Sequence, residues 1–141
     1  MKKILSENIA TKGMLIIFSL ITIFHVLVIT GVVPFQIVWG GRLQNREQML
    51  VFEAVSIALN TIMLIVVMVR AGMLSISIRP SVLKVIFWTM CGLFLLNTVG
   101  NLFSANSFEK AFFTPLTLLL AVFSWRLAVN DSAKIKIVEA N

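Results

Sequence analysis

Apolar residues gather in four long runs along the chain, separated by shorter polar segments. The runs cover residues 13–33, 50–69, 85–103 and 111–129. An α-helix rises about 1.5 Å per residue and the hydrocarbon core of a bilayer is about 30 Å thick, so about 20 apolar residues cross it once. The pattern predicts an all-α, polytopic membrane protein in which four transmembrane helices form a bundle and residues 1–141 form a single membrane domain.

The composition agrees with this prediction. Hydrophobic residues make up 59% of the chain and charged residues 13%, and the mean hydropathy is +0.99. Soluble domains carry about 45–50% apolar and about 25% charged residues, so an ordinary soluble enzyme is excluded. Cys91 is the only cysteine, which excludes an intrachain disulfide, a CxxC redox pair and a cysteine-ligated zinc site. We expect no metal site and no cofactor.

The basic residues predict how the helices are oriented. Of the twelve lysines and arginines, nine fall at the N-terminus, in residues 70–84 or near the C-terminus, and three fall between the other spans: Arg42, Arg46 and Lys110. By the positive-inside rule both termini are cytoplasmic, and we expect a bacterial cytoplasmic membrane. The charges stand singly at the span ends rather than in a stripe, which indicates topology and contact with anionic lipid instead of nucleic-acid binding.

Polar side chains inside a membrane span are costly, so their positions carry information about function. Within each span they recur at helical spacing, and they fall in the half that the orientation predicts to be outer. If the polar faces meet, they line a cavity that opens outward. The residues are His25, Glu53, Asn60, Asn97, Asn101, Thr114 and Thr117.

The same residues also fit a simpler role. Asn and Thr at helical spacing commonly form hydrogen bonds between packed transmembrane helices, worth about 0.6–2 kcal/mol each. A single histidine is a poor metal site. The position of His25 is compatible with two roles, a hydrogen-bonded residue of the core or a residue that binds a ligand. Because packing contacts should occur at every depth, the concentration of polar groups in the outer halves favours a site.

The segment after the first span is too apolar for a free loop, from Phe35 to Trp39. We expect it to lie in the interface or to fold back over the bundle, after Pro34 ends the first helix and before Gly40 and Gly41 permit a sharp turn. A carboxylate at the depth of Glu53 needs a partner, and Arg42 is the expected one because a guanidinium binds carboxylate bidentately.

The last span contains Pro115, which conflicts with a continuous helix. Either Thr114 caps a second helix, or one helix kinks at Pro115, and the short run that follows favours the kink. Ser107 is the expected N-cap of the helix that leads into this span.

Three functions fit these patterns. The favoured one is the binding or transport of a small polar or cationic solute, or of a lipid headgroup, by Glu53, Asn60, Asn97 and Asn101 with Arg42 at the mouth. The second is an accessory protein, such as a subunit, chaperone or immunity-type protein, that binds another membrane protein or a second copy of itself. The third is a membrane-embedded enzyme in which His25 and Glu53, or Glu53 and Glu109, act as acid and base on a lipophilic substrate. We favour a binding role over an enzyme and assign no catalytic residue.

Overall fold

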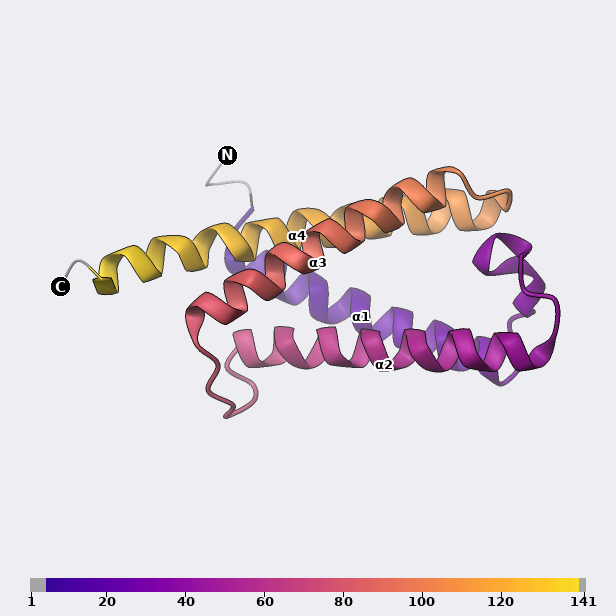
Figure 1. The fold of residues 1–141 in the computed structure, drawn as a ribbon, viewed down its shortest axis with the longest axis horizontal. Helices are drawn as coiled ribbons and strands as arrows, with labels where there is room; N and C mark the ends of the chain where they lie inside the picture. Colours follow the sequence, from indigo (N-terminus) through magenta and orange to yellow (C-terminus); the bar gives the residue numbers. More distant parts are fainter. Residues whose placement is uncertain (1–4, 140–141) are drawn as a thin grey trace.

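The computed structural model describes residues 5–139, with side chains for residues 5–129, and it is all-α (Figure 1). Each of its four helices contains a stretch long and apolar enough to cross a membrane, so the fold predicted from the sequence is confirmed. Two short 3₁₀ turns, η1 and η2, connect the first two helices. The elements are α1 (Glu7–Ile29), η1 (Phe35–Ile37), η2 (Trp39–Gly41), α2 (Arg46–Arg70), α3 (Pro80–Leu102) and α4 (Ser107–Glu139).

Three helices, α1, α2 and α4, begin before the apolar runs because side-chain caps set their N-termini. Ser6 accepts a hydrogen bond from the amide of Ile9 at 3.2 Å, so α1 begins six residues before the run. The expectation that Pro34 ends this helix is wrong. The helix ends at Ile29, and Gly31 turns the chain away with φ +80°.

Side-chain caps also begin α2 and α4, and the cap of α4 corrects the sequence prediction. Asn45 caps α2 by accepting from the amide of Gln48 at 2.9 Å. At α4 the cap is Asn106 rather than Ser107, because the Asn106 side chain accepts from the amides of Phe108 and Glu109 at 2.9 and 3.3 Å.

The helix α4 continues through Pro115 from Ser107 to Glu139. Thr114 therefore caps no second helix, and that alternative is wrong. Neighbouring helices and side-chain hydroxyls make proline tolerable in a membrane helix, because they satisfy backbone groups that the ring frees.

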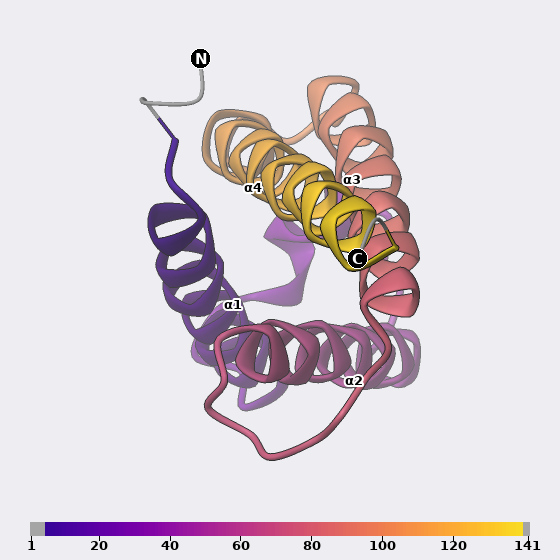
Figure 2. The same cartoon turned by 90° about the vertical axis from the view of Figure 1, so that its left-hand side faces the viewer.

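The four helices form a ring that is open on one side. Figure 2 shows α1 between α2 and α4, with α3 beside α4. The longest packed interface joins α3 to α4, shorter ones join α1 to α2 and α1 to α4, and α2 barely contacts α3. The open side of the ring therefore lies between α2 and α3.

The main core occupies the half of the bundle where α1 begins, which we call the termini end. Phe18 of α1, Phe87 of α3, and Leu120 and Leu127 of α4 are fully buried there. Close approach of α1 to α4 is possible because Gly13 has no side chain, and a methyl group there would overlap the ring of Phe123. This packed core closes the termini end of the bundle.

Residues 34–45, which we call the strap, fold back over the opposite end of the bundle, the strap end. Val38 and Leu43 of the strap are buried against Val28 of α1 and Met49 of α2. The prediction that this apolar segment folds back is thus confirmed. The turn also confirms the expected role of the two glycines, since Gly40 and Gly41 have φ of +66° and +70°.

Candidate functional site

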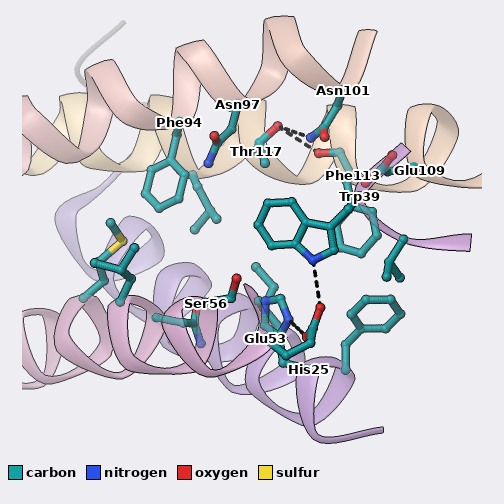
Figure 3. A pocket seen from close by; sticks show the side chains of 17 residues that line it. His25, Trp39, Glu53, Ser56, Phe94, Asn97, Asn101, Glu109, Phe113 and Thr117 are labelled. Atoms are coloured by element: carbon teal, nitrogen blue, oxygen red, sulfur yellow. Dashed lines mark hydrogen bonds and ion pairs between the residues drawn. The ribbon is translucent and has the colours of Figure 1, made fainter. Parts of the chain in front are cut away.

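A cavity of about 340 Å³ lies in the strap half of the bundle and is partly open to its surroundings (Figure 3). All four helices and the strap contribute to its wall. Its volume falls at the lower end of the range found for small-molecule sites, about 300–1,000 Å³. The polar residues that line it are His25, Glu53, Ser56, Asn60, Asn97, Asn101, Glu109 and Thr117.

Six of the eight residues proposed from the sequence line this cavity, and two do not. Figure 3 shows Asn97, Asn101 and Thr117 on one side, facing His25 and Glu53 on the other. Arg42 and Thr114 are absent from the lining. Thr114 is instead half-buried, and its hydroxyl oxygen is buried with no hydrogen-bond partner within the described residues.

Glu53 is fully buried, and both of its carboxylate oxygens are hydrogen-bonded. The indole N–H of Trp39 donates to Oε1 at 2.8 Å, and Nδ1 of His25 lies 2.5 Å from Oε2. The expected pairing with Arg42 is wrong. The strap turns so that the Trp39 indole reaches inward, while the Arg42 side chain is exposed.

His25 is the only histidine in the sequence and it lies on the cavity wall. Its Nδ1 is held by Glu53, whereas Nε2 makes no hydrogen bond within residues 5–129. A carboxylate that fixes one imidazole nitrogen sets the orientation of the ring and leaves the other nitrogen available. The pair therefore gives the cavity one oriented nitrogen that can donate or accept a proton.

The strap also binds the other half of the bundle through a second carboxylate. Oε2 of Glu109 in α4 accepts from the backbone amide of Gly40 and from the hydroxyl of Ser104, both at 2.6 Å. Adjacent residues of the strap, Trp39 and Gly40, thus reach carboxylates on α2 and α4. Since Trp39 has φ +55°, an uncommon value for a residue other than glycine, the strap holds a conformation that these contacts must stabilise.

Some of the polar residues do serve as links between helices. The Asn60 amide of α2 donates to the carbonyl of Phe18 at 2.9 Å and to the hydroxyl of Thr22, both in α1. Thr98 of α3 donates to the hydroxyl of Thr117 in α4 at 2.9 Å. For Asn60 and Thr117 the packing role is therefore real, although both also line the cavity.

Other polar groups on the wall retain hydrogen-bonding capacity. The side chain of Asn97 is exposed and makes no hydrogen bond within the described residues, and Asn101 makes only one long contact, 3.4 Å to Thr117. An amide side chain can donate twice and accept twice. At membrane depth lipid tails cannot satisfy these groups, so water or a polar ligand has to.

Aromatic rings form much of the remaining wall. Phe24 and Phe113 meet edge to face at a centroid distance of 5.1 Å, and Phe24 also lies against His25 at 6.1 Å. Among the described residues, neither lysine nor arginine lines the cavity. Two carboxylates and several aromatic faces without a fixed cation are suited to a positively charged or neutral group rather than an anion.

The residues not predicted from the sequence for this region are Trp39 and Thr98, and Glu109 was expected only as an acid-base partner of Glu53. Trp39 stands at the end of an apolar loop segment, directly before two glycines, and a turn there is what directs its ring inward. Glu109 lies in the first turn of α4. Thr98 is three residues from Asn101, on a neighbouring face of the same helix.

No group of three or more metal-ligating side chains occurs in the part of the chain that the structure describes. Comparison with known proteins found no matching family model, no similar curated protein and no similar solved structure. What the fold and the site define together is a class: a four-helix membrane protein with a polar and aromatic cavity at the strap end.

Proposed function

We propose that this protein binds a small polar or cationic group in the cavity at its strap end. One observation carries the proposal: the four helices direct eight polar residues onto one cavity of about 340 Å³, and several of these residues have unused hydrogen-bonding capacity. Ionisable residues within membrane spans commonly mark functional sites, and Glu53 is fully buried at such a depth.

The chemistry of the wall favours a cation or a hydrogen-bond donor. Glu53 and Glu109 supply two carboxylates, and Trp39, Phe24 and Phe113 supply ring faces that attract an ammonium group. An anion would meet two carboxylates with no lysine or arginine on the described wall. The ligand class that fits is therefore an amine or quaternary ammonium group.

The packed core at the termini end favours binding over a permanent channel. Phe18, Phe87 and Leu120 are fully buried on the termini side of the cavity. A solute could pass only if this core opened. With both termini in the cytoplasm, as the positive-inside rule predicts, the cavity belongs to the outer half of the membrane.

The experiment uses Trp39 as a reporter. Trp88 and Trp125 are exposed, with 46% and 40% of their surface accessible, so replacing both by Phe leaves Trp39 as the single tryptophan at the cavity. The purified protein in nanodiscs is titrated with tetramethylammonium, ammonium and a panel of small neutral solutes. We expect a saturable change of Trp39 fluorescence with the quaternary ammonium probe.

Two further variants sharpen this test. Asn97→Ala leaves all described hydrogen bonds in place, so it should fold normally and yet weaken binding by several-fold. Glu53→Gln should weaken binding more strongly, while Glu47→Gln in the exposed first turn of α2 should have no effect. No saturable response to any member of the panel, in a protein that is folded by circular dichroism, would contradict the proposal.

The 2.5 Å contact between His25 and Glu53 also favours a second function, general-base catalysis. A carboxylate-oriented imidazole with one available nitrogen can activate water toward a lipophilic ester. The test is hydrolysis of p-nitrophenyl decanoate by the protein in nanodiscs. A rate above that of empty nanodiscs, lost in His25→Gln and kept in Asn97→Ala, is expected of the catalyst; an unchanged rate in His25→Gln excludes it.

A further inference from the structure

We infer that the ligand of this cavity is an amphiphile with a cationic or neutral hydrogen-bonding head, which enters sideways from the bilayer through the opening between α2 and α3. The inference rests on the proposed binding function and specifies the class of its ligand. Three observations carry it: the polarity of the wall changes along the helix axes, the mouth lies at membrane depth, and the described wall bears two carboxylates but no lysine or arginine.

The wall is polar near the strap and apolar toward the core. On each helix the lining residue nearest the strap is polar, the lining residue nearest the core is apolar, and residues of both kinds lie between them. The polar set is His25, Glu53, Asn101 and Glu109, and the apolar set is Ile21, Met63, Phe94 and Leu120. A ligand that satisfies both ends has a polar head directed toward the strap and an apolar tail directed toward the core.

The length of the cavity suits such a molecule. Glu53 and Met63 lie ten residues apart on α2 and both line the wall, which corresponds to roughly 15 Å along the helix axis. A small solute would occupy only the polar end and leave the apolar end filled with water or empty. A head with a medium-length alkyl chain fills both ends.

The mouth of the cavity lies between α2 and α3. Leu59 of α2 is 53% exposed and Asn97 of α3 is also exposed, although both line the cavity. The two helices barely contact one another, and Figure 2 shows them on the open side of the ring. Since both residues lie inside membrane-spanning helices, the mouth faces lipid rather than water.

The strap covers the alternative route from the aqueous side. Its hydrogen bonds from Trp39 to Glu53 and from Gly40 to Glu109 bridge the end of the bundle, at 2.8 and 2.6 Å. A molecule dissolved in the bilayer therefore meets an opening, whereas one dissolved in water meets the strap. This geometry therefore favours a ligand that enters the cavity from the bilayer.

The test compares a cationic amphiphile with its isolated head. Decyltrimethylammonium and tetramethylammonium are titrated into the protein that retains only Trp39, in nanodiscs, with empty nanodiscs to correct for partitioning. Decyl sulfate serves as the anionic probe of equal chain length. We expect saturable binding of decyltrimethylammonium and none of decyl sulfate.

The lateral route is tested by narrowing the mouth. Ser56 lines the cavity beside Leu59, and its hydroxyl bonds only within its own helix, to the carbonyl of Phe52 at 2.8 Å. Ser56→Phe should lower the affinity for decyltrimethylammonium by about ten-fold or more and for tetramethylammonium by much less. Ala58→Phe, exposed on the same helix and outside the cavity wall, is the matched control and should change neither.

The outcomes separate this inference from the proposed function. One outcome is that the two ammonium probes bind with equal affinity after correction for partitioning into the bilayer, and that Ser56→Phe changes both affinities alike or neither. This outcome overturns the amphiphile inference but leaves the proposed cavity binding intact. If decyl sulfate binds as well as decyltrimethylammonium, the assignment of the head is overturned. If neither an ammonium probe nor any neutral solute of the panel binds, both the proposed function and the inference fail.

Discussion

Trp39 donates its indole N–H to the fully buried carboxylate of Glu53 at 2.8 Å, which ties the strap to the polar end of the cavity. The donor lies in a loop and the acceptor in a membrane helix fourteen residues later. The contact supplies one of the two partners that a carboxylate in this position needs, and His25 supplies the other. The strap is therefore part of the site rather than a passive connection.

Replacing Trp39 by Phe removes the N–H but keeps an aromatic ring against Phe52, which lies 5.0 Å away between centroids. Because a buried carboxylate oxygen then lacks a donor, we expect a loss of about 1–3 kcal/mol in the free energy of unfolding. Reversible unfolding in mixed micelles measures this value. The control is Trp88→Phe at a lipid-exposed position, and equal stability of the two variants would show that the hydrogen bond is unimportant.

The pairing of His25 with Glu53 predicts a compensating double variant. His25→Leu leaves the buried carboxylate without one partner, and breaking a buried pair in this way costs about 3–5 kcal/mol. Adding Glu53→Gln to His25→Leu removes the charge, so the double variant should be more stable than His25→Leu alone. A double variant whose loss equals the sum of the single losses would argue against coupling between the two residues.

Glu109 should control the mobility of the strap. Its Oε2 accepts from the amide of Gly40 and from the hydroxyl of Ser104, and Glu109→Leu removes both hydrogen bonds. We expect faster hydrogen exchange in residues 38–42, with little change in α1 and α2, because the strap opens locally. Glu47→Leu is the control. Unchanged exchange in the strap would mean that its other contacts hold it, such as the hydrogen bonds from Trp39 to Glu53 and from Asn106 to the carbonyl of Ile37.

Two threonines on α4 should respond oppositely to the same substitution. The buried hydroxyl of Thr114 has no partner in the described structure, so Thr114→Val should be neutral or stabilising by up to about 1 kcal/mol. Thr117 accepts from Thr98 at 2.9 Å, and Thr117→Val should destabilise by about 0.6–2 kcal/mol. Each variant is the control for the other, and a reversed order in unfolding experiments would contradict the hydrogen-bond assignment.

The periodicity of the sequence was sufficient to predict which helix faces meet. Helical spacing places Glu53 with Asn60, and Asn97 with Asn101, and all four line one cavity. Helical spacing could not predict which of Thr114 and Thr117 lines the cavity, because residues three apart differ by only about 60° around a helix. Thr117 lines the cavity, whereas Thr114 is absent from the lining and its hydroxyl oxygen is buried without a partner in the described structure.

The partners of Glu53 could not be predicted in full from spacing. The choice between Arg42 and Trp39 depends on the backbone at the turn, where Trp39 itself adopts φ +55° and is followed by two glycines of positive φ. A conformation that L-residues rarely adopt is stabilised by tertiary contacts, which no local pattern encodes. The general need for a partner at Glu53 was nevertheless predictable, because a carboxylate at membrane depth requires one.

The most direct test of the cavity as a binding site is nuclear Overhauser contact between a bound ammonium probe and the protein. Tetramethylammonium is added to the ¹⁵N-labelled full chain in nanodiscs, and contacts from its methyl protons are recorded. A binding site predicts contacts with the Trp39 indole and the side-chain amides of Asn97 and Asn101, which are lost in Glu53→Gln. Contacts confined to lipid-exposed positions such as Leu96, which is 70% exposed, or none at all, would contradict it.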